Sequence, residues 1–161
     1  MKNYLKNVSS MIRNATLLLL VLTPFLNLTA QDLAENDPNS TNGLVYFLRG
    51  KNYAGSATAF SALIDGNRVC KLNNRRYSVH EVTPGEHEFK AQFGGKKGKK
   101  KAEVTTITIE AGKTYYLQMI MHMNFWYGNV YPQEITRNGA LRLLVDDKLK
   151  LDPYCGDESI Q

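Results

Sequence analysis

The chain has 161 residues, a formal net charge of +5 at pH 7 and only two cysteines. This length fits one domain, which can bury about two-thirds of its unfolded surface and does not need disulfides to fold. The cysteines form no Cys-x-x-Cys pair, which excludes a zinc ribbon and a redox motif of that type.

The first thirty residues have the pattern of a secretory signal peptide. Three basic residues precede an apolar run, 15–28, and a small residue, Ala30, follows it. This order predicts cleavage before Gln31 and therefore export. The alternative, an uncleaved membrane anchor, fits less well because a spanning helix needs about 20 apolar residues and this run is shorter and interrupted by Pro24. No cysteine follows the run, so a bacterial lipid anchor is not expected.

Removal of the signal peptide would lower the net charge of the protein. Loss of residues 1–30 removes three basic residues and no acidic ones, which lowers the net charge from +5 to +2. The mature domain then concentrates its positive charge in one segment, 94–101, and the rest is slightly acidic. The lysines of this segment are Lys96, Lys97, Lys99, Lys100 and Lys101.

Residues 31–42 are rich in Asp, Asn and Ser and are predicted to form a flexible linker. A β-sandwich domain is expected over 43–151, followed by a polar tail at 152–161. Short apolar or alternating segments separated by turn signals such as Asp65-Gly66 predict seven or eight strands in an antiparallel sandwich. The expected strands are 44–48, 57–64, 68–72, 77–82, 86–93, 105–109, 114–124 and an edge strand at 130–136 that contains Pro132.

The stretch 110–124 is the segment around which we expect the domain to be organised. After a turn, its side chains alternate, so that one face is wholly apolar and needs a second layer to cover it. The residues on this face are Tyr115, Leu117, Met119, Met121 and Met123. The methionines are interpreted as core residues; the alternative is a flexible ligand-binding face.

The end of the chain changes to a helical period. Leu141, Leu144, Val145 and Leu149 recur at helical spacing, with Asn138 as the expected N-cap. The sequence therefore predicts a short C-terminal amphipathic helix, ended by Pro153, that packs on or beside the sheets.

Cys70 and Cys155 are a possible disulfide, because an exported protein meets oxidising conditions. The alternative is that Cys155 lies unpaired in the polar tail.

Two segments are candidate ligand contacts. The five lysines suit anionic envelope components such as lipopolysaccharide, acidic glycan or phospholipid head groups, and nucleic acid is not expected for an exported chain. The alternative is a solvated hairpin tip. Phe125, Trp126 and Tyr127 suit an aromatic platform that stacks sugars or anchors at an interface; the alternative is that the tryptophan ring caps the core.

A metal or enzymatic site is the alternative to a binding module. His80, Glu81 and His87 flank a Pro-Gly turn, and a hairpin would bring the two histidines near each other. The helical His-x-x-x-His spacing of metalloproteases is absent, and no serine lies in a Gly-x-Ser-x-Gly setting. No catalytic residue, resident metal or cofactor is predicted from these patterns.

An ordered set of motifs resembles a known family. The segments 45–49, 64–66, 83–87 and 110–116 occur in the order and spacing of the bacterial domain-of-unknown-function family 2846. Two of them also resemble the small surface β-domains named after a Pro-Glu-Gly-Ala motif. The resemblance spans 44–149 and implies a β-sandwich in the cell envelope, with no catalytic residues to transfer. We therefore expect an exported, periplasmic or envelope-associated, non-catalytic module that binds envelope components or an envelope protein, without a transmembrane span after cleavage.

Overall fold

The computed structural model describes residues 33–52, 56–93, 103–123, 128–153 and 155. The chain divides into two units, Met1–Leu33 and Ala34–Gln161. The second unit holds all the strands and the helix considered below.

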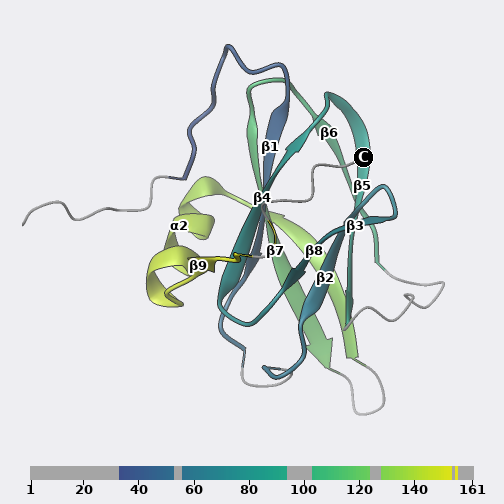
Figure 1. The fold of residues 1–161 in the computed structure, drawn as a ribbon, viewed down its shortest axis with the longest axis vertical. Helices are drawn as coiled ribbons and strands as arrows, with labels where there is room; N and C mark the ends of the chain where they lie inside the picture. The colour runs from purple at the N-terminus through teal and green to yellow at the C-terminus, as the bar shows by residue number, and fades with distance from the viewer. Residues whose placement is uncertain (1–32, 53–55, 94–102, 124–127, 154, 156–161) are drawn as a thin grey trace, which may run out of the picture. The chain divides into compact units, whose positions relative to one another are not determined.

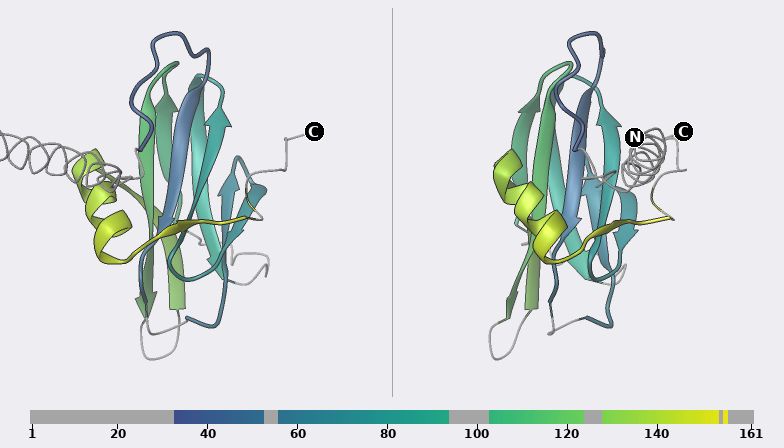
Figure 2. Two further views of the ribbon diagram at one scale, coloured as in Figure 1. Left: turned by 60° about the vertical axis from the view of Figure 1, so that its left-hand side comes forward. Right: turned by 90° about the vertical axis from the view of Figure 1, so that its left-hand side faces the viewer.

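Two sheets pack face to face, with the helix α2 on the outer side of one of them (Figures 1 and 2). The five-stranded sheet has the order β8-β7-β1-β4-β9, and the four-stranded sheet has the order β3-β2-β5-β6. This arrangement confirms the predicted β-sandwich with a C-terminal helix. The elements are β1 (Gly43–Arg49), β2 (Phe60–Ile64), β3 (Asn67–Leu72), β4 (Arg76–Val82), β5 (Gly85–Phe93), β6 (Thr105–Ile109), β7 (Thr114–Met123), β8 (Gly128–Ile135), α2 (Arg137–Asp146) and β9 (Lys150–Leu151).

The strand directions are more mixed than the sequence indicates. β1 runs parallel to β7, and β9 runs parallel to β4, whereas the other five pairings are antiparallel. β1 takes a central place because its residues from Val45 to Leu48 are buried on both faces, as in strands covered by a layer on each side. β8, with Pro132, is an edge strand as predicted.

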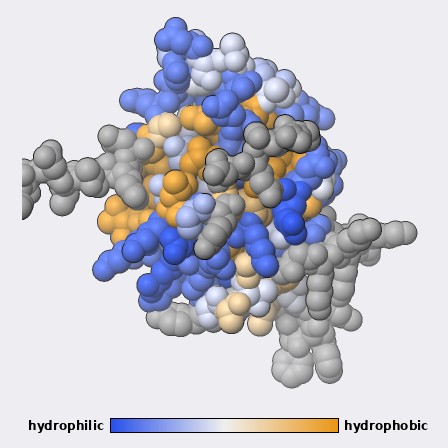
Figure 3. All heavy atoms as spheres, in the orientation of Figure 1, coloured by the Kyte–Doolittle hydropathy of each residue, from blue (hydrophilic) through white to orange (hydrophobic). Residues whose placement is uncertain are grey.

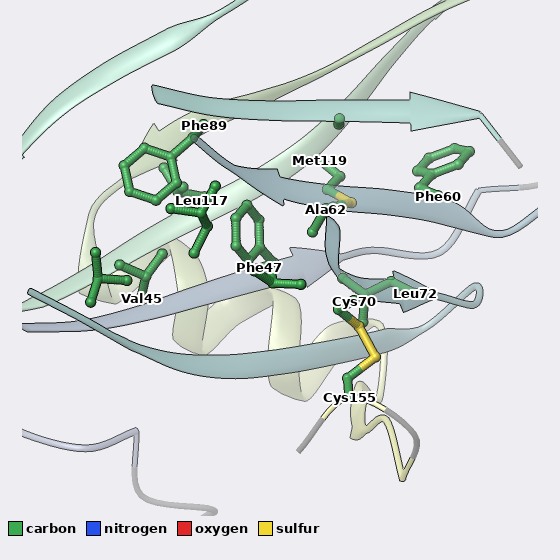
Figure 4. Close-up of a cluster of buried hydrophobic side chains, with 14 of the residues drawn as sticks. Val45, Phe47, Phe60, Ala62, Cys70, Leu72, Phe89, Leu117, Met119 and Cys155 are labelled. Carbon is green, nitrogen blue, oxygen red and sulfur yellow. A yellow bond between two sulfur atoms is a disulfide. The ribbon is translucent and has the colours of Figure 1, made fainter. Parts of the chain in front are cut away.

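The core lies between the inner faces of the two sheets (Figure 4). Phe47 of β1 meets Phe89 of β5 across this space, with ring centroids 6.1 Å apart. Leu117 and Met119 of β7 are buried beside them, which confirms the apolar face predicted for this strand. Met123 is 63% exposed because β7 extends beyond the core.

Helix α2 begins two residues earlier than expected. Thr136, rather than Asn138, is the N-cap, and its side chain accepts a hydrogen bond from the backbone N–H of Gly139 at 3.2 Å. Ala140 and Leu144 are buried against the domain, whereas Val145 is 72% exposed, so the expected apolar face was wrong at this position. The chain also leaves the helix after Asp146 and forms β9 where the sequence indicated more helix.

The residues before β1 belong to the domain rather than to a linker. The backbone N–H of Asp37 donates to the Gly112 carbonyl at 2.9 Å, and the backbone N–H of Gly112 donates to the Asn42 carbonyl at 2.9 Å. Gly112 has a φ of 73°, and a Cβ there would collide with the Asp37 carbonyl. Only glycine fits this close approach without strain.

The domain also extends beyond residue 151. The buried Asp152 donates its backbone N–H to the Tyr77 carbonyl at 2.9 Å. Cys155 is buried and forms a disulfide with Cys70 of β3, which lies at the border of the core (Figure 4). The segment after β9 is thereby tied to the opposite sheet.

Replacing Cys70 by Ser is expected to lower the free energy of unfolding by about 2–5 kcal/mol, because the bond closes a long loop between cysteines 85 positions apart. Urea denaturation followed by circular dichroism measures this change. Cys155→Ser and reduction of the unmodified protein should each give the same loss. An oxidised protein no more stable than its reduced form would contradict the assignment.

Candidate functional site

The candidate contact residues Lys96, Lys97, Lys99, Lys100, Lys101, Phe125, Trp126 and Tyr127 lie outside the described residues. The strand ends on either side of them are described. β5 ends at Phe93, and Met123 pairs with Gly128 where β7 gives way to β8. A Cβ on Gly128 would come within 3.2 Å of the Phe93 ring. The chain therefore enters the lysine segment and leaves the aromatic segment at neighbouring points, at one end of the sandwich.

His80 lies in β4, on the inner face that it shares with its cross-strand neighbour Val45. Its Nε2 lies 2.9 Å from Ser78 Oγ, and its ring meets Phe47 edge-on with centroids 5.8 Å apart. Burial lowers the pKa of His80 to about 4, so the imidazole is neutral at pH 7.

His87 has a separate environment at the start of β5. Its Nδ1 lies 2.6 Å from Asp65 Oδ2, and its Nε2 lies 2.9 Å from the Thr83 carbonyl oxygen. Both neighbours can accept a hydrogen bond from a ring N–H of His87. Burial opposes the ionisation of Asp65, but hydrogen bonds from the Glu88 backbone N–H and from His87 outweigh it and lower the pKa of this carboxyl.

His80, Glu81 and His87 therefore do not form one site. Side chains alternate along β4, so Glu81 is exposed on the outer side, where it accepts a hydrogen bond from Asn42 Nδ2 at 3.3 Å. The turn after Val82 connects the five-stranded sheet to the four-stranded sheet, so His87 lies in a different sheet from His80. No group of three His, Cys, Asp or Glu side chains within the described ranges could hold a metal ion.

The structure adds a cavity that the sequence analysis missed. A hollow of about 320 Å³ lies where the segment 34–36, the start of β7, the end of β8 and the first residues of α2 meet. Its charged lining side chains are Glu35, Glu134 and Arg137, and its polar ones include Thr114 and Tyr116. These residues come from distant parts of the chain and follow no motif, so no sequence pattern could have grouped them.

Hydrophobic residues reach the surface on the left-hand side of the domain, where α2 lies, among hydrophilic residues (Figure 3). Val145 of α2 is the most exposed large hydrophobic residue among those described. The cavity itself is lined mainly by polar and charged side chains, which suits a polar rather than an apolar occupant.

Comparison with known proteins identifies the family. A family model described as "Protein of unknown function (DUF2846)" matches residues 39–131, more than half of the chain. The chain belongs to this family. No curated protein and no solved structure matches the chain.

The family match is narrower than the resemblance in the sequence indicates. It runs from the turn before β1 into β8 and stops before α2, β9 and Cys155. Of the cavity residues, Thr114, Tyr115 and Tyr116 lie within the matched range, whereas the segment 34–36 and residues 134–137 lie outside it.

None of the helices described for this chain is long and apolar enough to cross a membrane.

The buried His80 predicts a pH-dependent stability. Its folded pKa of about 4 lies below the ordinary 6.5, so between these values the unfolded chain binds the extra proton and stability falls as the pH falls. The loss approaches about 3 kcal/mol near pH 4. His80→Gln, which keeps a hydrogen-bonding group near Ser78, should remove this component from the urea unfolding free energy measured between pH 7 and 4.

His122 provides the matched control, because it is exposed on β7. His122→Gln should keep the pH dependence of the unmodified protein. Equal slopes for His80→Gln and the unmodified protein would show that His80 protonates as readily in the folded chain as in the unfolded one.

Proposed function

We propose that this protein is an exported, non-catalytic module of the bacterial cell envelope that binds anionic envelope components through the lysine segment 94–101 and the aromatic residues Phe125–Tyr127. The observation that carries the proposal is the closeness of Phe93 and Gly128, which flank these segments. In the sequence, the five lysines follow Phe93 and the three aromatic residues precede Gly128. A lipopolysaccharide surface offers phosphates to the lysines and a sugar layer to the aromatic rings.

Export is supported by the signal-peptide pattern and by the disulfide between Cys70 and Cys155. Disulfides form and persist in oxidising compartments and are rare in the bacterial cytosol. A periplasmic or envelope-associated location follows from the proposal, and an envelope protein with an acidic surface is a further partner of the same chemistry.

The first test is binding to vesicles that contain lipopolysaccharide. Each lysine near an anionic surface contributes about 1 kcal/mol, and salt screens this attraction. The purified protein should therefore sediment with the vesicles at low salt and dissociate as the salt concentration rises. A variant with Lys96, Lys97, Lys99, Lys100 and Lys101 all changed to Ser should remain in the supernatant.

The matched control changes five other exposed lysines to Ser, which alters the net charge by the same amount. These are Lys51, Lys71, Lys113, Lys148 and Lys150. Its binding should stay close to that of the unmodified protein. If both variants lose binding equally, general charge rather than the lysine segment is responsible, and if the unmodified protein ignores the vesicles, the proposed ligand is wrong.

Export is tested separately. When the full-length gene is expressed in a bacterium, the protein should be recovered from the envelope fraction with Gln31 as its first residue, as determined by N-terminal sequencing. Replacing Leu18 and Leu19 in the apolar run by Arg should leave the uncleaved chain in the cytoplasm. Recovery of the unmodified protein from the cytoplasm with its first thirty residues intact would rule out export.

A further inference from the structure

The cavity at the start of α2 has walls that are fixed by hydrogen bonds. The Ala34 backbone N–H donates to the Tyr46 hydroxyl at 3.0 Å, and the Tyr116 hydroxyl donates to the Ala34 carbonyl at 3.3 Å. Asn36 Oδ1 accepts from the Thr114 backbone N–H at 3.0 Å. The segment 34–36 is therefore held against β7, and the cavity is formed before any ligand arrives.

One polar atom in this wall lacks a partner. Thr114 Oγ1 is buried, and the structure gives it no hydrogen bond. A buried hydroxyl without a partner costs about 1–3 kcal/mol. The atom is closed to solvent in this conformation, so a ligand in the cavity would gain its hydrogen bond only after the Thr114 side chain rotates about χ1.

Arg137 lies at a position that the dipole of α2 disfavours for a positive charge. It is the first residue of α2, and the first turn of this helix contains no acidic residue. A cation at a helix N-terminus meets the positive end of the helix dipole, which disfavours it by a few tenths of a kcal/mol or more. A bound anion would reverse this effect, because it would meet the guanidinium and the N-terminal end of α2 together.

The remaining charges of the cavity are negative. Glu35 and Glu134 line the same hollow as Arg137. Arg137 and Glu35 both interact electrostatically with Tyr116. Opposite charges thus converge on one polar residue.

We propose that this cavity binds a small zwitterion, an α-amino acid, with its carboxylate at Arg137 and Thr114 and its ammonium group at Glu35 and Glu134. A plain anion would meet two carboxylates, and a plain cation would meet the guanidinium, so only a ligand with both charges satisfies the whole lining. The volume of about 320 Å³ lies at the small end of ligand pockets, which fits one amino acid.

This inference is independent of the proposed envelope contact. Thr114 begins β7 and Met123 ends it, so the cavity and the flanks of the lysine segment lie at opposite ends of this strand. A strand of this length spans about 30 Å. The two sites can therefore be altered separately.

The test is an NMR titration of the protein purified after expression of the full chain. Glycine, L-alanine, L-glutamate and L-lysine are the probes, and acetate and methylammonium carry one charge each as controls. Zwitterions should shift the backbone amide signals of Thr114, Tyr116 and Arg137, and should do so at concentrations at least tenfold below those that acetate or methylammonium require.

Variants separate the two halves of the site. Arg137→Gln and Glu134→Gln are exposed positions that should leave the fold intact, and each should weaken binding of the best probe about tenfold or more. Arg142→Gln is the matched control, because Arg142 is an exposed arginine of the same helix outside the cavity. It should bind like the unmodified protein.

The absence of amide shifts with every zwitterion at about 10 mM, roughly tenfold above the upper end of ordinary KM values, would overturn the proposal. Equal binding of acetate and glycine would also overturn it and would make this a simple anion site. Equal losses of binding in Arg137→Gln and Arg142→Gln would overturn it as well. Glycylglycine, whose charges are farther apart, should bind more weakly than glycine. Tighter binding of the dipeptide would replace the free amino acid by a peptide as the ligand.

Discussion

The burial of β1 on both faces is the constraint on which the rest of the domain depends. Its inner face, with Val45 and Phe47, meets the four-stranded sheet, and its outer face, with Tyr46 and Leu48, is covered in turn. A strand that has no solvent-exposed face must lie in the centre of a sheet that is covered by a layer on each side. β7 and β4 therefore flank it, and the second sheet and the α2 side supply the two covers.

The same constraint explains where a ligand site arises. Tyr46 and Tyr116 pack together on the outer face with their rings tilted and the ring centroids 5.3 Å apart, and their hydroxyl groups bond to Ala34. The chain before β1 is thus fixed beside the N-terminal end of α2, although the two are far apart in sequence. Most of the residues that line the cavity lie outside the range matched by the family model. These include all three charged residues, Glu35, Glu134 and Arg137, so the family match does not account for the charges of the cavity.

The strands were predictable because their cause is local. Alternation placed Leu117 and Met119 in the core, and the alternating pattern of β5 and β6 predicted these two strands. The parallel pairing of β1 with β7 was not predictable, because no local pattern encodes which distant strand becomes a neighbour. The polar segment 34–42 looked like a linker since its stabilising hydrogen bonds go to Gly112 and Thr114, residues that sequence spacing does not connect to it. The cavity was missed for the same reason.

The sandwich is closed differently along its two lateral margins. On one side, the hydroxyl of Thr105 in β6 bonds to the Pro132 carbonyl of β8, and the contacts described between the sheets there are noncovalent. On the other side, the covalent bond from Cys70 reaches the segment that follows β9. We therefore expect a transient separation of the sheets to begin between β6 and β8, because the disulfide keeps the opposite margin closed. Without the disulfide, noncovalent contacts alone would hold both margins, and the two sheets could then separate along either of them.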